Sequence, residues 1–356
     1  MSRPAFGRFV ALTERDAPQL LARKTKAELG IDAERYGIRS RLVVRPDATL
    51  LGLATAVFEK LCTETGHTRE NFRGIVLSSR NLEIENEAQQ LQQQLGGDLV
   101  VRGIERACSG FPAATALAVE MVEQLSGLVA VITAETISRN INWELPDGSG
   151  DDHSRARGQA SKLFADGAAA VVVEPVVATG THEILDAWSS HIPDEDQLLQ
   201  KAEVEDVHDP WGHVRHGVTT CITMPGRRGF QLLKRGPQVM TDALAESLAR
   251  VHSAGRSSHG IVAAVVHHQA NGLMVPRLEQ ALADTTWGAT ARVFDCIADH
   301  GNTVSATIPL AMADVQDELP PNSLVGMPSV GAGGPGYRPD VLSVGCVLIR
   351  TAAESA

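Results

Sequence analysis

Short apolar runs that suit β-strands alternate with segments of helical periodicity along most of this 356-residue chain. Residues 74–78 predict a buried strand, and residues 83–95 predict a polar-faced helix that ends at Gly96 and Gly97. Residues 99–104 predict the next strand. Apolar side chains spaced three and four apart from Phe111 to Leu125 then indicate a buried helix. Alternation of this kind is typical of a layered α/β fold.

The alternation resumes in the second part of the chain after an irregular interval. Residues 181–229 are rich in His, Asp, Pro and Gly, and we expect an irregular connection and cap there, with a short helix at 194–203. A Gly-Ile-Val string opens an expected strand in each part, which suggests an internal duplication into halves 1–178 and 179–356. The other predicted strands are 129–133, 168–173, 260–266, 292–297 and 343–350, and the other predicted helices are 239–253, 273–283 and 303–317.

The composition excludes several classes of function. A net charge of −11 argues against a nucleic-acid-binding surface, which needs a basic patch. The five cysteines are scattered and form no Cys-x-x-Cys pair, which disfavours a compact cysteine-based metal site and suits a reducing compartment. No signal peptide is recognisable, and no run approaches the roughly 20 apolar residues that span a bilayer. We therefore expect a cytoplasmic protein without a metal, a cofactor or a membrane partner.

Three separated islands carry complementary chemistry, and each lies where a strand-like run gives way to a helix start. They are Arg-Ala-Cys-Ser-Gly-Phe at 106–111, His-His-Gln-Ala-Asn at 267–271 and His-Gly-Asn-Thr at 300–303. At a helix N-terminus the thiolate of Cys108 would be stabilised, and its backbone N–H would supply half of an oxyanion hole. An inert buried cysteine is the alternative, because cysteine commonly fills cores as a small hydrophobe.

The other two islands supply an imidazole and an amide. Adjacent residues at a strand end face opposite ways, so only one of His267 and His268 can face the site, and we expect it to be His268. Asn302 could be a plain helix N-cap. Beside Cys108 and His268 it would instead be a neutral hydrogen-bond donor that holds an enolate oxygen.

A glycine-dense segment, Ala-Gly-Gly-Pro-Gly-Tyr at 332–337, precedes the last predicted strand. Phosphate-binding glycine motifs lie before a helix, so this segment does not match them. It can offer a backbone N–H to an oxyanion, or it can be a tight surface hairpin, and the sequence does not separate these two interpretations.

From about Gly37 to its C-terminus the chain resembles the ketoacyl synthase III branch of the thiolase-like condensing enzymes. The motifs that carry the resemblance are residues 37–41, 107–111, 163–168, 268–271, 300–303 and the late glycine segment. The resemblance implies an αβαβα five-layer sandwich of two similar halves, usually a homodimer, with a Cys–His–Asn site below a pantetheine tunnel. The roles it implies are an acylated Cys108, a decarboxylating pair of His268 and Asn302, a second oxyanion donor at Gly334, and coenzyme A contacts at Asn271, Arg35 and Arg157.

The implied reaction loads an acyl group from an acyl-CoA or acyl-carrier-protein thioester onto Cys108 and condenses it with a malonyl-type thioester. The alternatives are acyl transfer to an O, N or S acceptor, and head-to-head condensation of two acyl thioesters. Some family members of the head-to-head kind carry a glutamate base about 25 residues before the cysteine, which here matches Glu83 or Glu85; carboxylates at a helix start are the plainer explanation.

Three departures from the family pattern favour a specialised polyketide or fatty-acid-derived pathway. Leu273 replaces an arginine that helps to dock acyl carrier protein in primary-metabolism members. Ile84 and Glu85 replace an aromatic-proline pair. Residues 181–229 form a longer segment than in typical members.

Overall fold

The computed structural model describes residues 3–31, 33–81, 83–143, 160–194, 200–223, 226–256, 260–334, 336 and 338–353. One continuous sheet runs through it in the order β12-β11-β13-β14-β8-β1-β7-β6-β4-β5. Its strands are β1 (Ala5–Ala11), β4 (Phe72–Ser78), β5 (Val100–Ile104), β6 (Leu128–Glu135), β7 (Gly167–Glu174), β8 (His182–Pro193), β11 (Val262–Val265), β12 (Arg292–Val293), β13 (Leu324–Gly334) and β14 (Arg338–Arg350).

The strand order contains a repeat. In the series β5-β4-β6-β7-β1 the first pairings are parallel and the last two are antiparallel. The series β12-β11-β13-β14-β8 has the same sequence of directions. The two series join where the start of β8 pairs with the start of β1. The sheet thus repeats one order of strand directions, and residue 178, the expected boundary, lies between β7 and β8.

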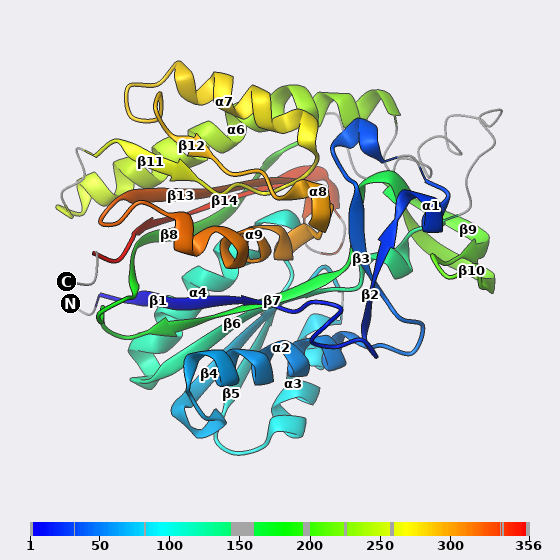
Figure 1. Cartoon of the computed structure of the whole chain (residues 1–356), viewed down its shortest axis with the longest axis horizontal. Coiled ribbons are helices and arrows are strands. Elements are labelled where there is room, and N and C mark those ends of the chain that lie inside the picture. The colour runs from blue at the N-terminus through cyan, green and yellow to red at the C-terminus, as the bar shows by residue number, and fades with distance from the viewer. Residues whose placement is uncertain are drawn as a thin grey trace.

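Helices cover both series of strands, and the predicted five layers are observed (Figure 1). On the outer faces lie α2 and α3 on one side and α6 and α7 on the other, while α4 and α9 fill the middle layer. Their bounds are α2 (Leu50–Thr65), α3 (Ile84–Leu95), α4 (Gly110–Leu125), α6 (Gly226–Ser253), α7 (Val275–Ala283) and α9 (Thr307–Val315).

The apolar pattern of each element follows from its layer. Strand β7 is an unbroken run of small and β-branched residues, because helices cover both of its faces. Helix α4 contacts β4 and β6 on one side and β8 and β14 on the other, so most of its surface is buried. No helix in the described ranges is long and apolar enough to cross a membrane.

Short elements at the ends of these strands carry the candidate site. They are the 3₁₀ turns η1 (Glu34–Tyr36), η3 (Ala107–Ser109), η5 (Gly272–Met274) and η6 (Val304–Ala306), and helix α8 (Ile297–His300). Two two-stranded ribbons lie outside the main sheet: β2 (Leu21–Thr25) with β3 (Ser40–Val44), and β9 (Gln200–His208) with β10 (Val214–Thr223).

The expectation of an irregular segment at 181–229 is wrong. This segment holds β8, the β9–β10 ribbon and the start of α6. The predicted helix at 194–203 is also wrong where it is described, because β9 begins at Gln200. A ribbon of two strands encloses little core, so its sequence can be mostly polar. Other bounds differ as well. The strand predicted at 292–297 ends at Val293, and the strand predicted from residue 343 begins at Arg338. The helix predicted from residue 239 begins at Gly226, and the helix predicted at 303–317 spans Thr307–Val315.

Candidate active site

Cys108 lies at the junction between β5 and α4, inside η3. The preceding residue, Ala107, has a φ of 47°, a left-handed conformation that is uncommon outside glycine. Gly110 begins α4, and a Cβ added there would lie 2.4 Å from Oγ of Ser78 and 2.7 Å from Cβ of Ser305. The missing side chain therefore lets this junction pack directly against the end of β4 and against η6.

The backbone of β13 lies against the cysteine itself. A Cβ added at Gly331 would be 2.4 Å from Cβ of Cys108 and 2.5 Å from its Sγ. Burial raises the pKa of the Cys108 thiol to about 12, the positive charge of Arg80 opposes that shift, and the negative charge of Glu135 adds to it. The resting thiol is therefore protonated at neutral pH.

His268 follows β11 and is 1% exposed. Its Nδ1 lies 2.6 Å from Oγ1 of Thr307, and that hydroxyl lies 2.9 Å from the carbonyl oxygen of Val304. Burial first, and then the neighbouring His267, lower the pKa of His268 to about 3, so the imidazole is neutral. The Thr307 hydroxyl has one proton, and its direction decides whether Nε2 of His268 accepts or donates a hydrogen bond.

His267 faces different partners. Its Nδ1 donates to the carbonyl oxygen of His268 at 2.8 Å, and the ring is fully buried. Gln269 fixes the rest of this loop: its side-chain amide donates to the carbonyl oxygen of Phe294, and its Oε1 accepts from the N–H of Cys296. The loop that carries His268 is thus tied to the segment between β12 and α8.

Asn302 follows α8, and its side chain is locked by two bonds. Nδ2 donates to the carbonyl oxygen of Ala270 at 3.3 Å, and Oδ1 accepts from the N–H of Val304 at 3.0 Å. Ala270 belongs to the same loop as His268, so the amide and the imidazole are positioned together. Val304 has a φ of 54°, which is strained for a β-branched residue.

The three islands converge on one place. The turns η3 and η6 are in contact, and Cys108 packs in the same apolar cluster as Val304. Val304 in turn binds Asn302 through its N–H and receives the Thr307 hydroxyl on its carbonyl. The fold therefore brings together the segments that carry Cys108, His268 and Asn302.

The glycine-dense segment forms the β13–β14 turn, where Pro335 and Tyr337 lie outside the described residues. A Cβ at Gly334 would meet Val341 and His191, whereas Gly331, three residues earlier, is the glycine that touches Cys108. The segment is thus a hairpin turn, and the part of β13 that approaches Cys108 is Gly331 and not Gly334.

The residues predicted to bind coenzyme A are placed less completely. Arg157 lies outside the described residues, and for Arg35 the structure describes only the backbone, in η1. Asn271 caps η5 by accepting the N–H of Leu273. Gly37 packs on Gly272: a Cβ added at Gly37 would lie 3.3 Å from Cα of Gly272. The segments that carry Arg35 and Asn271 are therefore neighbours.

Glu83 and Glu85 lie exposed at the N-terminus of α3, beside β5 at the end of the sheet. Oε2 of Glu85 accepts the N–H of Gly103 in β5 at 3.4 Å. This placement is that of carboxylates at a helix start. Within the described parts of the chain, no group of three or more His, Cys, Asp or Glu could hold a metal ion.

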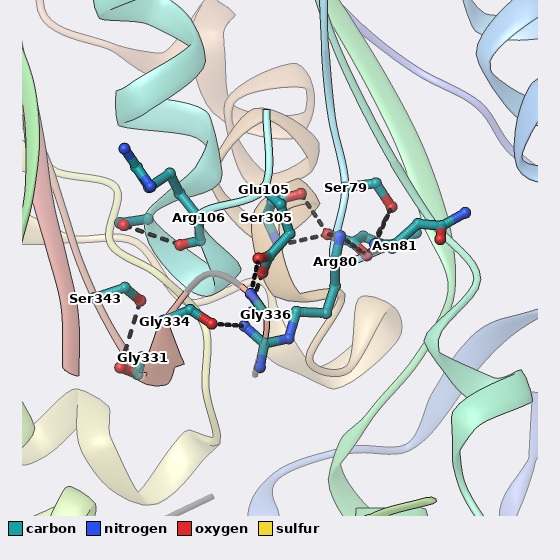
Figure 2. Close-up of polar contacts among 12 residues, drawn as sticks. Ser79, Arg80, Asn81, Glu105, Arg106, Ser305, Gly331, Gly334, Gly336 and Ser343 are labelled. Carbon is teal, nitrogen blue, oxygen red and sulfur yellow. Dashed lines mark hydrogen bonds and ion pairs between the residues drawn. The ribbon is translucent and has the colours of Figure 1, made fainter. Parts of the chain in front are cut away.

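Sequence reasoning missed a charged network beneath Cys108. Glu135 is buried at the end of β6 and accepts the N–H of Arg80 at 3.0 Å and the hydroxyl of Ser305 at 2.5 Å. Arg80 in turn pairs with Glu105, three residues before the cysteine (Figure 2). Burial raises the pKa of Glu135 to about 7, although its hydrogen bonds and Arg80 oppose the shift. The sequence did contain one sign of this network: Arg80, Glu105 and Glu135 each lie at the end of an apolar strand or just after it.

Comparison with known proteins supports the resemblance. The model of 3-oxoacyl-[acyl-carrier-protein] synthase III matches residues 103–191, and the model of the C-terminal part of that family matches residues 254–350. The chain belongs to the ketoacyl synthase III family of thiolase-like condensing enzymes. It is an acyltransferase of the β-ketoacyl synthase III type.

Curated members of this family align along most of the chain. The β-ketoacyl-[acyl-carrier-protein] synthase III of Prochlorococcus marinus is 29% identical over 89% of this chain and 86% of its own length. The 3-oxopimeloyl-[acyl-carrier-protein] synthase of Rhodothermus marinus is 28% identical over 87% of this chain and 85% of its own length.

Solved structures share the fold. The synthase III of Aquifex aeolicus superposes with a TM-score of 0.66 at 23% identity, covering 98% of this chain and 100% of that one. The priming β-ketosynthase of the R1128 polyketide pathway gives a TM-score of 0.70 at 21% identity, covering 100% and 98%. The thiolase-like five-layer architecture predicted from the sequence is confirmed.

Proposed function

We propose that Cys108 accepts an acyl group from an acyl-CoA or acyl-carrier-protein thioester and that the acyl-enzyme condenses with a malonyl-type thioester. The observation that supports this proposal is that the loop of His268 and the side chain of Asn302 are anchored together, and that the turn after Asn302 contacts the turn of Cys108. A neutral imidazole held by the Thr307 hydroxyl and a neutral amide held by backbone groups suit an enolate oxygen. Simple acyl transfer generates no enolate and would leave Asn302 without a role.

In the acylation step the thiol proton of Cys108 passes to Nε2 of His268 when the Thr307 hydroxyl donates to Val304. The sulfur then bonds to the acyl carbon, the donor thioester C–S bond breaks, and the leaving thiolate takes the proton. The oxyanion is held by the N–H of Cys108 at the start of α4 and by a second backbone N–H. The resemblance implied Gly334 as the second donor. Because Gly331 contacts Cys108, we propose instead that the second N–H comes from the β13 backbone near Gly331.

In the condensation step the malonyl C–C bond to the carboxylate breaks, and carbon dioxide leaves. The electron pair forms an enolate whose oxygen accepts from Nδ2 of Asn302 and from Nε2 of His268. For the latter bond the ring must carry its proton on Nε2, so between the two steps it gives up the Nδ1 proton and takes one at Nε2 from water. The Thr307 hydroxyl then turns to donate to Nδ1. The enolate carbon attacks the acyl carbon, and the Cys108 thiolate is released.

The pathway, the carrier and the oligomeric state belong to the same proposal. Leu273 is 40% exposed at the position where an arginine was expected for carrier docking, which supports a specialised pathway. Arg35, Asn271 and Arg157 would hold the coenzyme A arm. A homodimer fits the family and the placement of β5 at the end of the sheet.

The test is mass spectrometry of the intact protein after exposure to a panel of acyl thioesters. Cys108→Ala should abolish the adduct, whereas Cys296→Ala should retain it; a label mapped to Cys62, Cys221, Cys296 or Cys346 would refute the assignment. His268→Ala should keep measurable self-acylation and lose malonyl decarboxylation, and His267→Ala is its control. An ester, amide or new thioester product in place of a 3-ketoacyl product would favour the acyltransferase alternative.

A further inference from the structure

A buried ion pair lies beside the nucleophile and takes no part in the steps above. Arg80 follows β4 and Glu105 follows β5, and Nη1 of Arg80 lies 3.0 Å from Oε1 of Glu105. The two side chains are only 4% and 9% exposed. Removing two charges from water opposes folding, and apolar packing at such a position is often at least as stable. The contacts of the pair indicate another use for it.

The pair cross-links three segments of the site. Nη1 of Arg80 also contacts the carbonyl oxygen of Gly334 at 3.5 Å, and the N–H of Gly336 donates to Oε2 of Glu105 at 2.8 Å. Figure 2 shows the Arg80 guanidinium at the β13–β14 turn. The end of β4, the segment that leads to Cys108 and this turn are therefore fixed to one another.

The turn reaches the nucleophile through β13. Gly331 packs against Cβ and Sγ of Cys108, and its carbonyl oxygen accepts the hydroxyl of Ser343 at 3.4 Å. A shift of the turn would therefore change the space around the sulfur. The main-chain N–H of Arg80 also binds Glu135, which holds Ser305 of η6. One arginine thus connects the nucleophile junction with the segment that follows Asn302.

The charges around the thiol have identifiable effects. Arg80 from the end of β4 favours the thiolate, while Glu135 from β6 disfavours it. Glu105 and Arg106 lie between the end of β5 and Cys108. His268, from the loop after β11, is neutral because burial lowers its pKa to about 3. Arg80 is the cation among these groups that lowers the pKa of the thiol.

We propose that Arg80 and Glu105 are positioning residues for the nucleophile: the pair holds the β13–β14 turn in place, and with it Gly331 of β13 against Cys108, and it places a cation where the Cys108 thiolate forms. This inference rests on the proposed function in that Cys108 is the acyl acceptor. Arg80 supplies the charge, and Glu105 keeps both the guanidinium and the turn in place.

Two reactions separate the electrostatic part from the positional part. The first is alkylation of Cys108 by iodoacetamide across about pH 7 to 9.5, followed by peptide mass spectrometry, which needs no acyl substrate. The second is self-acylation by the thioester that labels the wild type best. The variants are Arg80→Met, Arg80→Lys and Glu105→Gln. The control is Arg292→Met, which breaks an exposed pair in which Arg292 and Glu318 are 60% and 54% exposed.

We expect Arg80→Met to slow both reactions about tenfold or more, the change that one pKa unit produces. Arg80→Lys should regain most of the alkylation rate but only part of the acylation rate, because lysine lacks the planar fork. Glu105→Gln should accelerate alkylation, because Arg80 loses its counter-charge, and should slow acylation, because the turn loosens. Arg292→Met should change neither.

Wild-type rates in Arg80→Met and Glu105→Gln would overturn the proposal. The proposal is also overturned if both variants change the alkylation rate in the same direction and in proportion to their loss of thermal stability. That pattern would show that the pair only stabilises the fold. If Arg80→Met does not fold, Arg80→Lys and Glu105→Gln still test the proposal. Glu105→Gln must then accelerate alkylation and slow acylation, and Arg80→Lys must retain more of the alkylation rate than of the acylation rate. If no thioester acylates the wild type, the proposed function fails, while alkylation still tests the ion pair.

Discussion

Replacement of Gly331 by alanine tests whether β13 positions the nucleophile. Gly331 is buried, and its φ lies outside the left-handed region that favours glycine, so alanine meets no strain of that kind there. The effect comes from the added methyl group, which would lie 2.4 Å from Cβ and 2.5 Å from Sγ of Cys108. Carbon atoms in ordinary contact are about 3.5–4.0 Å apart, so either the strand or the cysteine must move by about 1 Å.

The size of the effect follows from that displacement. Overpacking of a core by one methyl group costs about 1–3 kcal/mol in the free energy of unfolding. A misplacement of about 1 Å at a reacting centre reduces rates by about 100-fold. We therefore expect Gly331→Ala to remain folded and to self-acylate about 100-fold more slowly than the wild type.

The measurements are the rate of acyl-adduct formation by intact-mass spectrometry and the free energy of unfolding in denaturant. Gly326→Ala is the matched control, because it lies on the same strand and its added Cβ would be 2.5 Å from a methyl carbon of Leu244, away from the cysteine. This control should lose stability and keep acylation. The reasoning is refuted if Gly331→Ala acylates at the wild-type rate, or if Gly326→Ala loses acylation to the same extent.

Three further predictions concern titratable groups. Because burial raises the pKa of Cys108 to about 12, alkylation of Cys108 in the free protein should rise about tenfold per pH unit from about pH 7 to 10, and a plateau below about pH 9 would contradict it. Asp166, directly before β7, is buried and accepts the N–H groups of Val44 and Ser138. Burial raises its pKa from 3.8 to about 6 against the effect of these bonds, so the protonated form is favoured in the folded state. The stability that this form contributes at low pH is lost as the pH rises through about 6. The unfolding free energy of the wild type minus that of Asp166→Asn should therefore fall from about pH 4 to 6 in denaturant titrations. A value that stays constant or rises over this range would refute the prediction. Glu83→Gln and Glu85→Gln should leave malonyl condensation unchanged, whereas loss of a product made from two non-malonyl acyl thioesters would favour the head-to-head alternative.

The parts of the fold that follow simple sequence patterns were predictable. The series β4, α3, β5 and α4 was found with its order and approximate bounds, because each element buries one stripe or one short apolar run. Strand β13 was not predicted, since its glycines and proline disfavour a strand. Two of those glycines are there because Leu244 and Cys108 pack directly on the backbone. A tertiary contact therefore decided the residue type against local propensity.

The candidate site divides in the same way. Cys108, His268 and Asn302 could be singled out because each lies in a short motif at the end of a strand or just before a helix. The Arg80–Glu105 pair could not, because its two residues follow different strands. They meet only because β4 and β5 are parallel neighbours whose carboxyl ends share one edge of the sheet. Periodicity does not report strand order, so a pair of this kind becomes visible only in three dimensions.

The repeat in the sheet explains why the site has contributions from both series of strands. The edge strand β5 leads through η3 into the central helix α4, and the edge strand β12 leads through α8 and η6 into the central helix α9. Each path contains one non-glycine residue with a left-handed backbone just before its helix, Ala107 in one and Val304 in the other.

Cys108 follows the first of these strained residues, and Asn302 precedes the second by two positions. The neighbouring strands correspond as well, because Arg80 follows β4 and His268 follows β11. Strained backbone persists only where the surrounding packing determines it, and here the two strained turns contact each other in the central layer. The repeated strand order thus places two corresponding junctions in contact with each other. One carries Cys108, the proposed nucleophile, with Arg80, and the other carries Asn302 and His268, which the proposed chemistry requires.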